Sequence, residues 1–277
     1  MKLKDTLLTA TQNLGRRKVR TVLTSVGVFV GILTIVTMVS LGVGIQEQIT
    51  NTIRNFGLEK VLVEPKVDLP STGQFNPNAR LRPEVPISPA ALQEMRQLSG
   101  VRDVTVAVSL PQAPEMTLTI GGKTFPIATR DRAPEERIFT SRIPVLAGME
   151  MSQSADARGV ALSPRVLRGA GFATSDFASL ISKPVTITVT APRGDNLTLQ
   201  TTLTGIVEIP GHQAAEIGNG DKAQIKAWWF NDPQIMETEG YLWAVLQTAS
   251  LNDATRVARE VEEGLGFSAA TLQTLLD

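Results

Sequence analysis

A run of residues without a charged side chain, Thr21 to Gln46, restricts this chain more than any other feature. As a helix it would be about 39 Å long at 1.5 Å per residue, which exceeds the roughly 30 Å hydrocarbon core of a bilayer. A secretory signal peptide has an apolar stretch of only about 7 to 15 residues, followed by an A-x-A-like cleavage site. Here the run ends in SLGVGIQEQ, with glycines where alanines would be expected. The run therefore predicts an uncleaved membrane-spanning helix.

The charges on either side of this run predict its orientation. Residues 1 to 46 carry six basic side chains and one acidic side chain, whereas the remainder carries 21 basic and 26 acidic side chains. Basic residues beside a membrane helix favour the cytoplasmic side of the cell (inner or plasma) membrane. We expect residues after about Gly44 to lie outside, and the basic cluster to lie in the cytoplasm: Arg16, Arg17, Lys18 and Arg20. The acidic remainder gives no electrostatic reason to expect nucleic-acid binding.

Both flanks of the run predict further helix. In residues 1–16, leucines alternate with polar and basic residues, as in an amphipathic segment on the inner leaflet. After the span, apolar residues at spacings of four and three share one helical face: Ile45, Ile49, Ile53 and Phe56. Residues 17–57 are therefore predicted to form a membrane helix continued by a stalk, and the alternative is a flexible tether with a coincidental stripe. Gly27 and Gly31 form a G-x-x-x-G pattern that permits close packing against another helix.

The rest of the chain predicts an α+β fold. A strand-like segment begins at residue 58, a helix begins at Ser88 and Pro89, and alternating valines then predict a second strand. Near the C-terminus, a strand is followed by a helix whose capping box is Ser250 and Asp253, and then by another strand-like segment. Two such units predict a ferredoxin-like βαβ-repeat subdomain. It would comprise residues 58–110 and 237–277.

Residues 111–236 are predicted to form an inserted β-rich subdomain. One hairpin is expected to turn at Gly121 and Gly122, another at the sequence PRGDN, and SPRVLRGAG predicts one short helix. The segment GHQAAEIGNGDK is predicted to be a surface loop. The densest aromatic cluster is interpreted as core packing, with an exposed interaction surface as the alternative. This cluster consists of Trp228, Trp229 and Phe230.

The chain lacks the side chains that most catalytic or metal sites require. It has no cysteine and one histidine, His212, which excludes zinc sites built on Cys and His and cysteine nucleophiles. The GGKT sequence imitates the end of a P-loop, but Thr117 stands where that motif needs its first glycine. The RGD tripeptide at Arg193 to Asp195 fits a turn between strands. We expect no cofactor, metal or catalytic activity, since an anchored enzyme would need a cleft with convergent carboxylates.

The order of segments along almost the whole chain resembles that of the MacB/FtsX-type ABC transporter permeases, which include the lipoprotein-releasing and macrolide-exporter permeases. The first sixty or so residues are the most specific. The resemblance implies a cytoplasmic N-terminal helix, a first membrane helix extended as a stalk, and an extracytoplasmic porter part interrupted by a β-rich part. The matching segments are TATQNLGRRKVRTVLTSVGVFVGI, VSLGVGIQEQI, LEKVLVEP, LSGVRDV, IPVLAGMEM, GVALSPRVL, KPVTITVT and LTGIVEI.

The same resemblance implies partners and a division of labour. In these families the permease performs no chemistry, an ABC ATPase hydrolyses ATP, and a homo- or hetero-dimer of permeases converts the cycle into movement outside the membrane. This chain departs from the pattern because no second apolar run of span length follows Gly44, so the C-terminal membrane helices are not found. We expect the front part of a permease, or a relative that works with a separately encoded partner. A free-standing single-span adaptor or substrate-binding module is the alternative.

Overall fold

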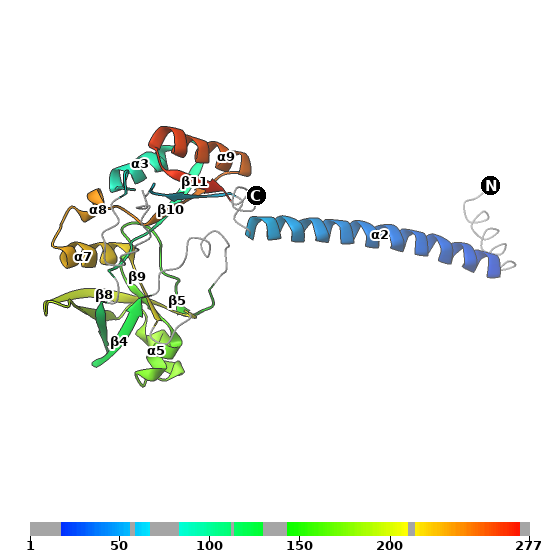
Figure 1. Cartoon of the computed structure of the whole chain (residues 1–277). Coiled ribbons are helices and arrows are strands. Elements are labelled where there is room, and N and C mark those ends of the chain that lie inside the picture. Colours follow the sequence, from blue (N-terminus) through cyan, green and yellow to red (C-terminus); the bar gives the residue numbers. More distant parts are fainter. Residues whose placement is uncertain are drawn as a thin grey trace, which may run out of the picture. The chain divides into compact units, whose positions relative to one another are not determined.

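The computed structural model describes residues 18–55, 59–66, 83–111, 114–129, 143–209 and 214–271. The chain separates into two units, one ending at Ile53 and the other beginning at Arg54. The described part of the first unit consists of helix α2 (Lys18–Asn55) up to Ile53, while the second unit holds the described strands (Figure 1). The predicted α+β class with an N-terminal apolar helix is confirmed.

The first sheet of the second unit has four strands, all of them antiparallel to their neighbours. Its spatial order is β11-β1-β10-β2, so β2 lies at one edge. The strands are β1 (Lys60–Glu64), β2 (Val101–Ala107), β10 (Trp243–Thr248) and β11 (Ser268–Thr271). Helix α3 (Pro89–Gln97) follows β1, and helix α9 (Leu251–Glu260) follows β10 and continues as a π-helical turn, η2 (Val261–Leu265).

Both of these helices begin at the predicted capping residues. The Ser88 hydroxyl accepts a hydrogen bond from the backbone N–H of Ala91, and the Ser250 hydroxyl accepts one from that of Asp253. Leucine, methionine and valine side chains of α3 and α9 pack with the strand side chains in one buried cluster. A second, smaller cluster combines strand residues alone: Leu62, Ala107, Trp243 and Val245. The strands thus contribute buried side chains to two separate clusters.

The second sheet has seven strands in the order β5-β8-β6-β9-β4-β3-β7, and β7 also pairs with β8. This extra pairing closes six of the strands into a ring, which we call the barrel, and leaves β5 beside β8. The strands are β3 (Glu115–Ile120), β4 (Lys123–Thr129), β5 (Val145–Gly148), β6 (Val160–Leu162), β7 (Pro184–Thr190), β8 (Asn196–Val207) and β9 (Ala214–Ile217). The accompanying helices are α5 (Pro164–Gly169), η1 (Thr174–Asp176), α6 (Phe177–Leu180), α7 (Asn219–Phe230) and α8 (Ile235–Thr238).

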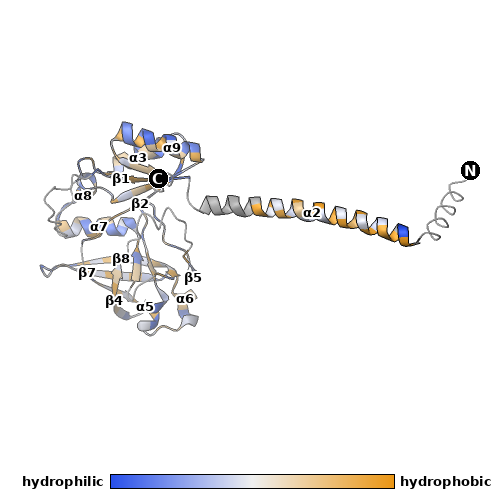
Figure 2. Cartoon of the chain, turned by 45° about the vertical axis from the view of Figure 1, so that its right-hand side comes forward, coloured by the Kyte–Doolittle hydropathy of each residue, from blue (hydrophilic) through white to orange (hydrophobic). Residues whose placement is uncertain are grey.

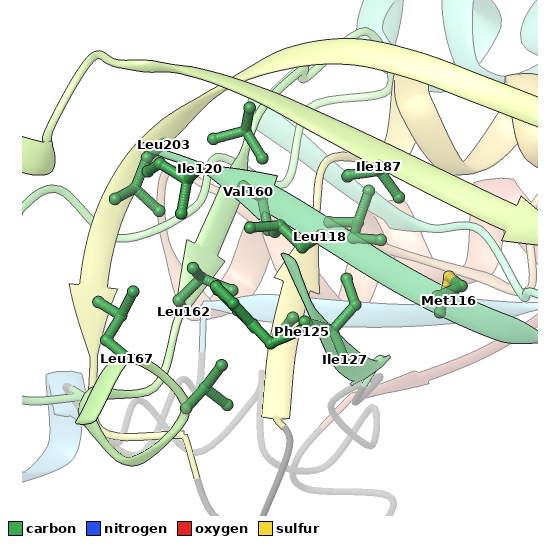
Figure 3. Close-up of a cluster of buried hydrophobic side chains, with 14 of the residues drawn as sticks. Met116, Leu118, Ile120, Phe125, Ile127, Val160, Leu162, Leu167, Ile187 and Leu203 are labelled. Atoms are coloured by element: carbon green, nitrogen blue, oxygen red, sulfur yellow. The ribbon is translucent and has the colours of Figure 1, made fainter. Parts of the chain in front are cut away.

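Buried side chains from the barrel strands, α5, α6 and α7 form the largest apolar cluster, part of which is drawn in Figure 3. Both predicted hairpins are confirmed, since β3 pairs with β4 and β7 pairs with β8 in antiparallel register. Gly121 and Gly122 have φ angles of +57° and +78°, which favour glycine in the tight turn between β3 and β4. The short helix predicted after Ser163 is α5.

The prediction of a surface loop for the segment GHQAAEIGNGDK is wrong over most of its length. Its described residues form strand β9, the connecting Gly218 and the start of helix α7. Strand β9 is buried at all four positions, so it shows no alternation that would mark it as a strand. Gly218 and Gly220, which look like helix breakers, bring the first turn of α7 close to the backbone of residues 156–158.

Candidate membrane anchor and the junction between the two sheets

Helix α2 contains one segment that is long and apolar enough to cross a membrane, Val22–Ile45. Its 24 residues measure about 36 Å at 1.5 Å per residue. None of the segment is buried inside the structure, in contrast to the core helix of a soluble protein. Figure 2 shows apolar residues repeating along the described part of this helix. Its surface therefore suits contact with lipid or with other apolar helices.

The threonines of the span satisfy their own hydroxyl groups. Each of three side-chain hydroxyls donates a 2.8 Å hydrogen bond to the carbonyl oxygen four residues earlier. The donors are Thr24, Thr34 and Thr37, and the acceptors belong to Arg20, Val30 and Leu33. Because unpaired polar groups are costly in hydrocarbon, these internal bonds suit a membrane environment.

The predicted orientation residues lie at the start of α2. Lys18 is its first residue and Arg20 is exposed, whereas Arg16 and Arg17 lie outside the described residues. Gly27 and Gly31 have no side chain or distant backbone within 4 Å of the place where a Cβ would stand. Their surfaces are open in the single chain, and their role in packing against another helix stays a prediction.

The predicted stalk residues fall on the last part of α2 and beyond it. Ile45 is 47% exposed, and Ile49 and Ile53 lie within the helix. Phe56 lies outside the described residues. The helical backbone thus continues past the span to Asn55, while the burial of the stripe against another element stays a prediction.

The N-terminus of α7 forms the junction between the barrel and the four-stranded sheet. The Asn219 side chain is nearly inaccessible, at 2% exposure. Its Oδ1 accepts a 3.2 Å hydrogen bond from the N–H of Val108, and its Nδ2 donates at 2.9 Å to the carbonyl of Val106. Nδ2 also lies 3.2 Å and 3.1 Å from the carbonyl oxygens of Gln153 and Ser154. One amide group therefore joins three segments that are far apart in sequence.

Asp221, two residues further along α7, fixes the same turn to the barrel side. Its Oδ2 accepts hydrogen bonds from the N–H of Gly159 at 2.8 Å and from the hydroxyl of Thr201 at 2.9 Å. Its Oδ1 lies 3.4 Å from Nη1 of Arg158, whose side chain is 65% exposed. The buried carboxylate is therefore hydrogen-bonded to both the 158–159 segment and strand β8.

A buried ion pair adds a second polar link along α7. Lys226 Nζ lies 3.2 Å from Glu239 Oε2, and the two side chains are only 6% and 8% exposed. Glu239 follows helix α8 and precedes strand β10 by four residues. Removing one partner of such a pair is costly because the other charge stays buried, so the pair favours one specific arrangement of α7 and the α8–β10 segment.

The predicted aromatic cluster lies at the C-terminal end of α7. Trp228, Trp229 and Phe230 are all half-buried, and the two tryptophans pack against the barrel cluster in an edge-to-face pair with centroids 6.2 Å apart. Arg193 of the RGD sequence lies over the Trp228 ring at 5.2 Å and donates to the carbonyls of Trp228 and Trp229. The RGD arginine thus stabilises the end of a helix.

The described residues contain no cluster suited to a metal ion. Within the segments that the structure describes, no three His, Cys, Asp or Glu side chains lie close enough to hold one. His212 lies outside those segments. The sequence pattern did not reveal the polar contacts of α7, because the residues that form each contact are not neighbours along the chain. These contacts are made by Asn219, Asp221 and the Lys226–Glu239 pair. The spacing of Ile225, Trp228 and Trp229, at three and four residues, was the available signal for α7.

Comparison with known proteins finds one family whose match spans both the apolar helix and the sheets. The family model for the MacB-like periplasmic core domain matches residues 21–263, which include the apolar span of α2 and most of the two sheets. The macrolide export ATP-binding/permease protein MacB of Marinobacter nauticus is 25% identical over 142 residues, which cover 51% of this chain and 19% of that protein. The chain belongs to the family of ABC transporter permeases with a MacB-like periplasmic core domain.

Proposed function

We propose that this chain is the membrane-anchored extracytoplasmic part of an ABC transporter permease, which acts in export or mechanotransmission driven by a separate ATPase. The observation that carries the proposal is the family match across both the apolar helix and the folded domain. The matching family is one of transporter permeases and not of enzymes.

The proposed topology places the N-terminus in the cytoplasm of the inner or plasma membrane and the second unit outside. The basic residues at the start of α2 support it, because Arg20 directly precedes the uncharged run. The described residues contain one candidate span, so the proposed topology is single-pass over that part of the chain. The periplasmic description of the matching family agrees with an extracytoplasmic second unit.

The four-stranded sheet is the proposed porter-like subdomain. Its order β11-β1-β10-β2 and the β-α-β order of each half support a ferredoxin-like fold. In this proposal, residues 58–110 and 237–277 form the porter and residues 111–236 the inserted subdomain, which contains the barrel. Residues 1–16 form the cytoplasmic lead-in, and residues 17–57 form the span and stalk.

The proposed partners are an ABC ATPase, reached through other membrane helices, and a second permease in a homo- or hetero-dimer. The open surface at Gly27 and Gly31 supports a helix contact within the membrane. Beyond the span, the stripe that includes Ile45, Ile49 and Ile53 is proposed to pack against another helix. Residues 46–55 would then carry movement between the membrane and the porter.

The test is to isolate the tagged full chain from its own membranes in mild detergent, with a photo-crosslinking residue at Gly31. We expect cross-links to a membrane helix of a permease and an ABC ATPase in the isolated complex. A crosslinker at Phe29, roughly opposite Gly31 on the helix, is the matched control and should give mainly lipid adducts. Isolation without any ATPase, with cross-links only outside the membrane, would favour the single-span adaptor.

A further inference from the structure

The edge of the four-stranded sheet is closed by a side chain of the inserted barrel subdomain. Among the strands that the structure describes, none pairs with β2 on its outer side. Along a strand, the C=O of one residue and the N–H of the second residue after it point the same way, toward the neighbour that would pair with them. Asn219 bonds to such a pair, the C=O of Val106 and the N–H of Val108. Its amide supplies one donor and one acceptor, as a strand residue does.

The hydrogen bonds around Asn219 leave little freedom to the turn that carries it. A Cβ on Gly218 would lie 2.3 Å from the carbonyl oxygen of Ala157, and one on Gly220 would lie 3.1 Å from the same atom. The N–H of Gly220 donates to this oxygen at 2.8 Å. The backbone before Asn219 is therefore held against residues 156–158 at a separation that requires glycine, and the backbone after it lies close to the same residues.

The two sheets have separate apolar cores, and polar contacts join them alongside apolar ones such as that of Ala155, which packs against the core under α3 and α9. The barrel cluster and the cluster under α3 and α9 share no residue. Between them lie Asn219, the 3.0 Å hydrogen bond from the Val106 N–H to the Gln153 carbonyl, and the Lys226–Glu239 pair. Hydrogen bonds are directional, so these contacts define one orientation more sharply than apolar packing does.

We infer that Asn219 is the latch that locks the barrel onto the edge of the four-stranded sheet, so that the two cores move and unfold as one body. The coupling stands on the contacts of the second unit alone. The role of this coupling, which is to make the barrel move together with the porter-like subdomain, rests on the proposed function. A failed latch and a failed transporter assignment therefore give different results in the experiments below.

The chain has three tryptophans, and their positions allow the unfolding of each sheet to be followed separately by tryptophan fluorescence. Trp243 lies in β10, and Trp228 and Trp229 lie in α7. A chain with Trp243→Phe reports on α7 and the barrel, whereas a chain with Trp228→Phe and Trp229→Phe reports on the four-stranded sheet. In urea, with the full chain in detergent micelles, we expect coincident unfolding midpoints for the two reporters.

Asn219→Ala in each reporter background should separate the midpoints by roughly 1 M urea, since several buried hydrogen bonds are lost from one side of the junction. Asn219→Asp keeps the size and the acceptor for Val108 but loses the donor toward three carbonyls, so it should separate them as well. The matched control is Asn252→Ala, at an exposed position of α9, which should leave them coincident. Coincident midpoints in both Asn219 variants would contradict the inference that Asn219 couples the two cores. Separate midpoints in the reporter chains that keep Asn219 would contradict it as well.

Hydrogen exchange in the unsubstituted chain gives an independent test if the variants fail to fold. The Val108 amide bonds to Asn219 and the Val106 amide to Gln153. If the junction opens only on global unfolding, these amides should exchange as slowly as amides in the centre of β1 and β8. Fast exchange at Val106 and Val108, with both sheets still protected, would contradict the inference.

Discussion

Proline at Ile49 tests whether the part of α2 beyond the membrane span is a rigid rod. Residues 46–55 extend about 15 Å past Val22–Ile45 at 1.5 Å per residue. Proline at residue 49 removes the N–H that donates to the carbonyl of Ile45 and clashes with that carbonyl, at a cost of about 3 kcal/mol or more. Helix propagation contributes at most about 0.3 kcal/mol per residue, so the whole segment holds only about 3 kcal/mol of its own. Ile49→Pro should therefore abolish its helix.

The assay is a distance measurement between spin labels at Gly42→Cys and Asn55→Cys, which are clean sites because the chain has no cysteine. A continuous helix places the two Cα atoms about 20 Å apart, so we expect a narrow distribution in the parent chain and a broad one with Ile49→Pro. Ile49→Ala is the control and should keep the narrow distribution, because alanine is the best helix former. A narrow distribution in Ile49→Pro would refute the argument that the cost of proline exceeds the helix stability of residues 46–55. A broad distribution in the parent chain would favour a flexible tether.

The same substitution has a functional consequence in an assembled transporter. If the rod carries movement, Ile49→Pro should leave ATP hydrolysis in place while transport falls, and Ile49→Ala should transport more than Ile49→Pro. Purified chain alone should hydrolyse no ATP. Transport at the parental rate with Ile49→Pro would remove the mechanical role of the segment.

Three further predictions concern topology, core packing and pH. Thr198→Cys, at an exposed position of β8, should react with a membrane-impermeant thiol reagent in intact cells, while Thr6→Cys should react only after lysis; the reverse pattern would invert the topology. Leu118→Ala, at a fully buried position of the barrel, should lower the free energy of unfolding by about 2–5 kcal/mol in urea titration, and a loss below about 1 kcal/mol would contradict the packing described. The hydrogen bond from Arg256 is the main cause that lowers the pKa of Asp253 below its ordinary value of 3.8. The stability it contributes is present above about pH 3.8 and is lost as pH falls through the lower folded-state pKa, so the difference in urea midpoint between the parent and Asp253→Asn should shrink below pH 3.8.

Local signals were enough to predict the elements whose cause is local. Ser88 and Ser250 start helices through bonds to residues three positions away, and the glycine pair at 121 and 122 turns a hairpin between adjacent strands. The valines of β2 alternate because one face packs under the helices, and Val104 and Val106 are buried as the alternation predicts. These elements needed no knowledge of the rest of the chain.

The junction was beyond such reasoning because its partners are remote. Asn219 bonds to residues 111 and 113 positions away, and no spacing rule connects an asparagine to a strand at that distance. Its neighbours Gly218 and Gly220 look like loop residues, although the structure uses them for close approach to Ala157. The start of helix α7 was also missed, because Gly218 and Gly220 look like residues that end a helix.

Asn219 at the junction is followed by Gly220, and an asparagine–glycine pair deamidates readily in flexible peptides. The nitrogen of the glycine attacks the side-chain carbonyl of the asparagine, ammonia leaves, and water opens the resulting ring to aspartate or isoaspartate. In this protein the Gly220 nitrogen is held by its hydrogen bond to Ala157, and the Asn219 amide is engaged on both of its atoms. We expect the folded chain to keep this amide far longer than an unfolded peptide of the same sequence. Each lost amide would place a negative charge among carbonyl oxygens, so the working life of the junction depends on how rarely it opens.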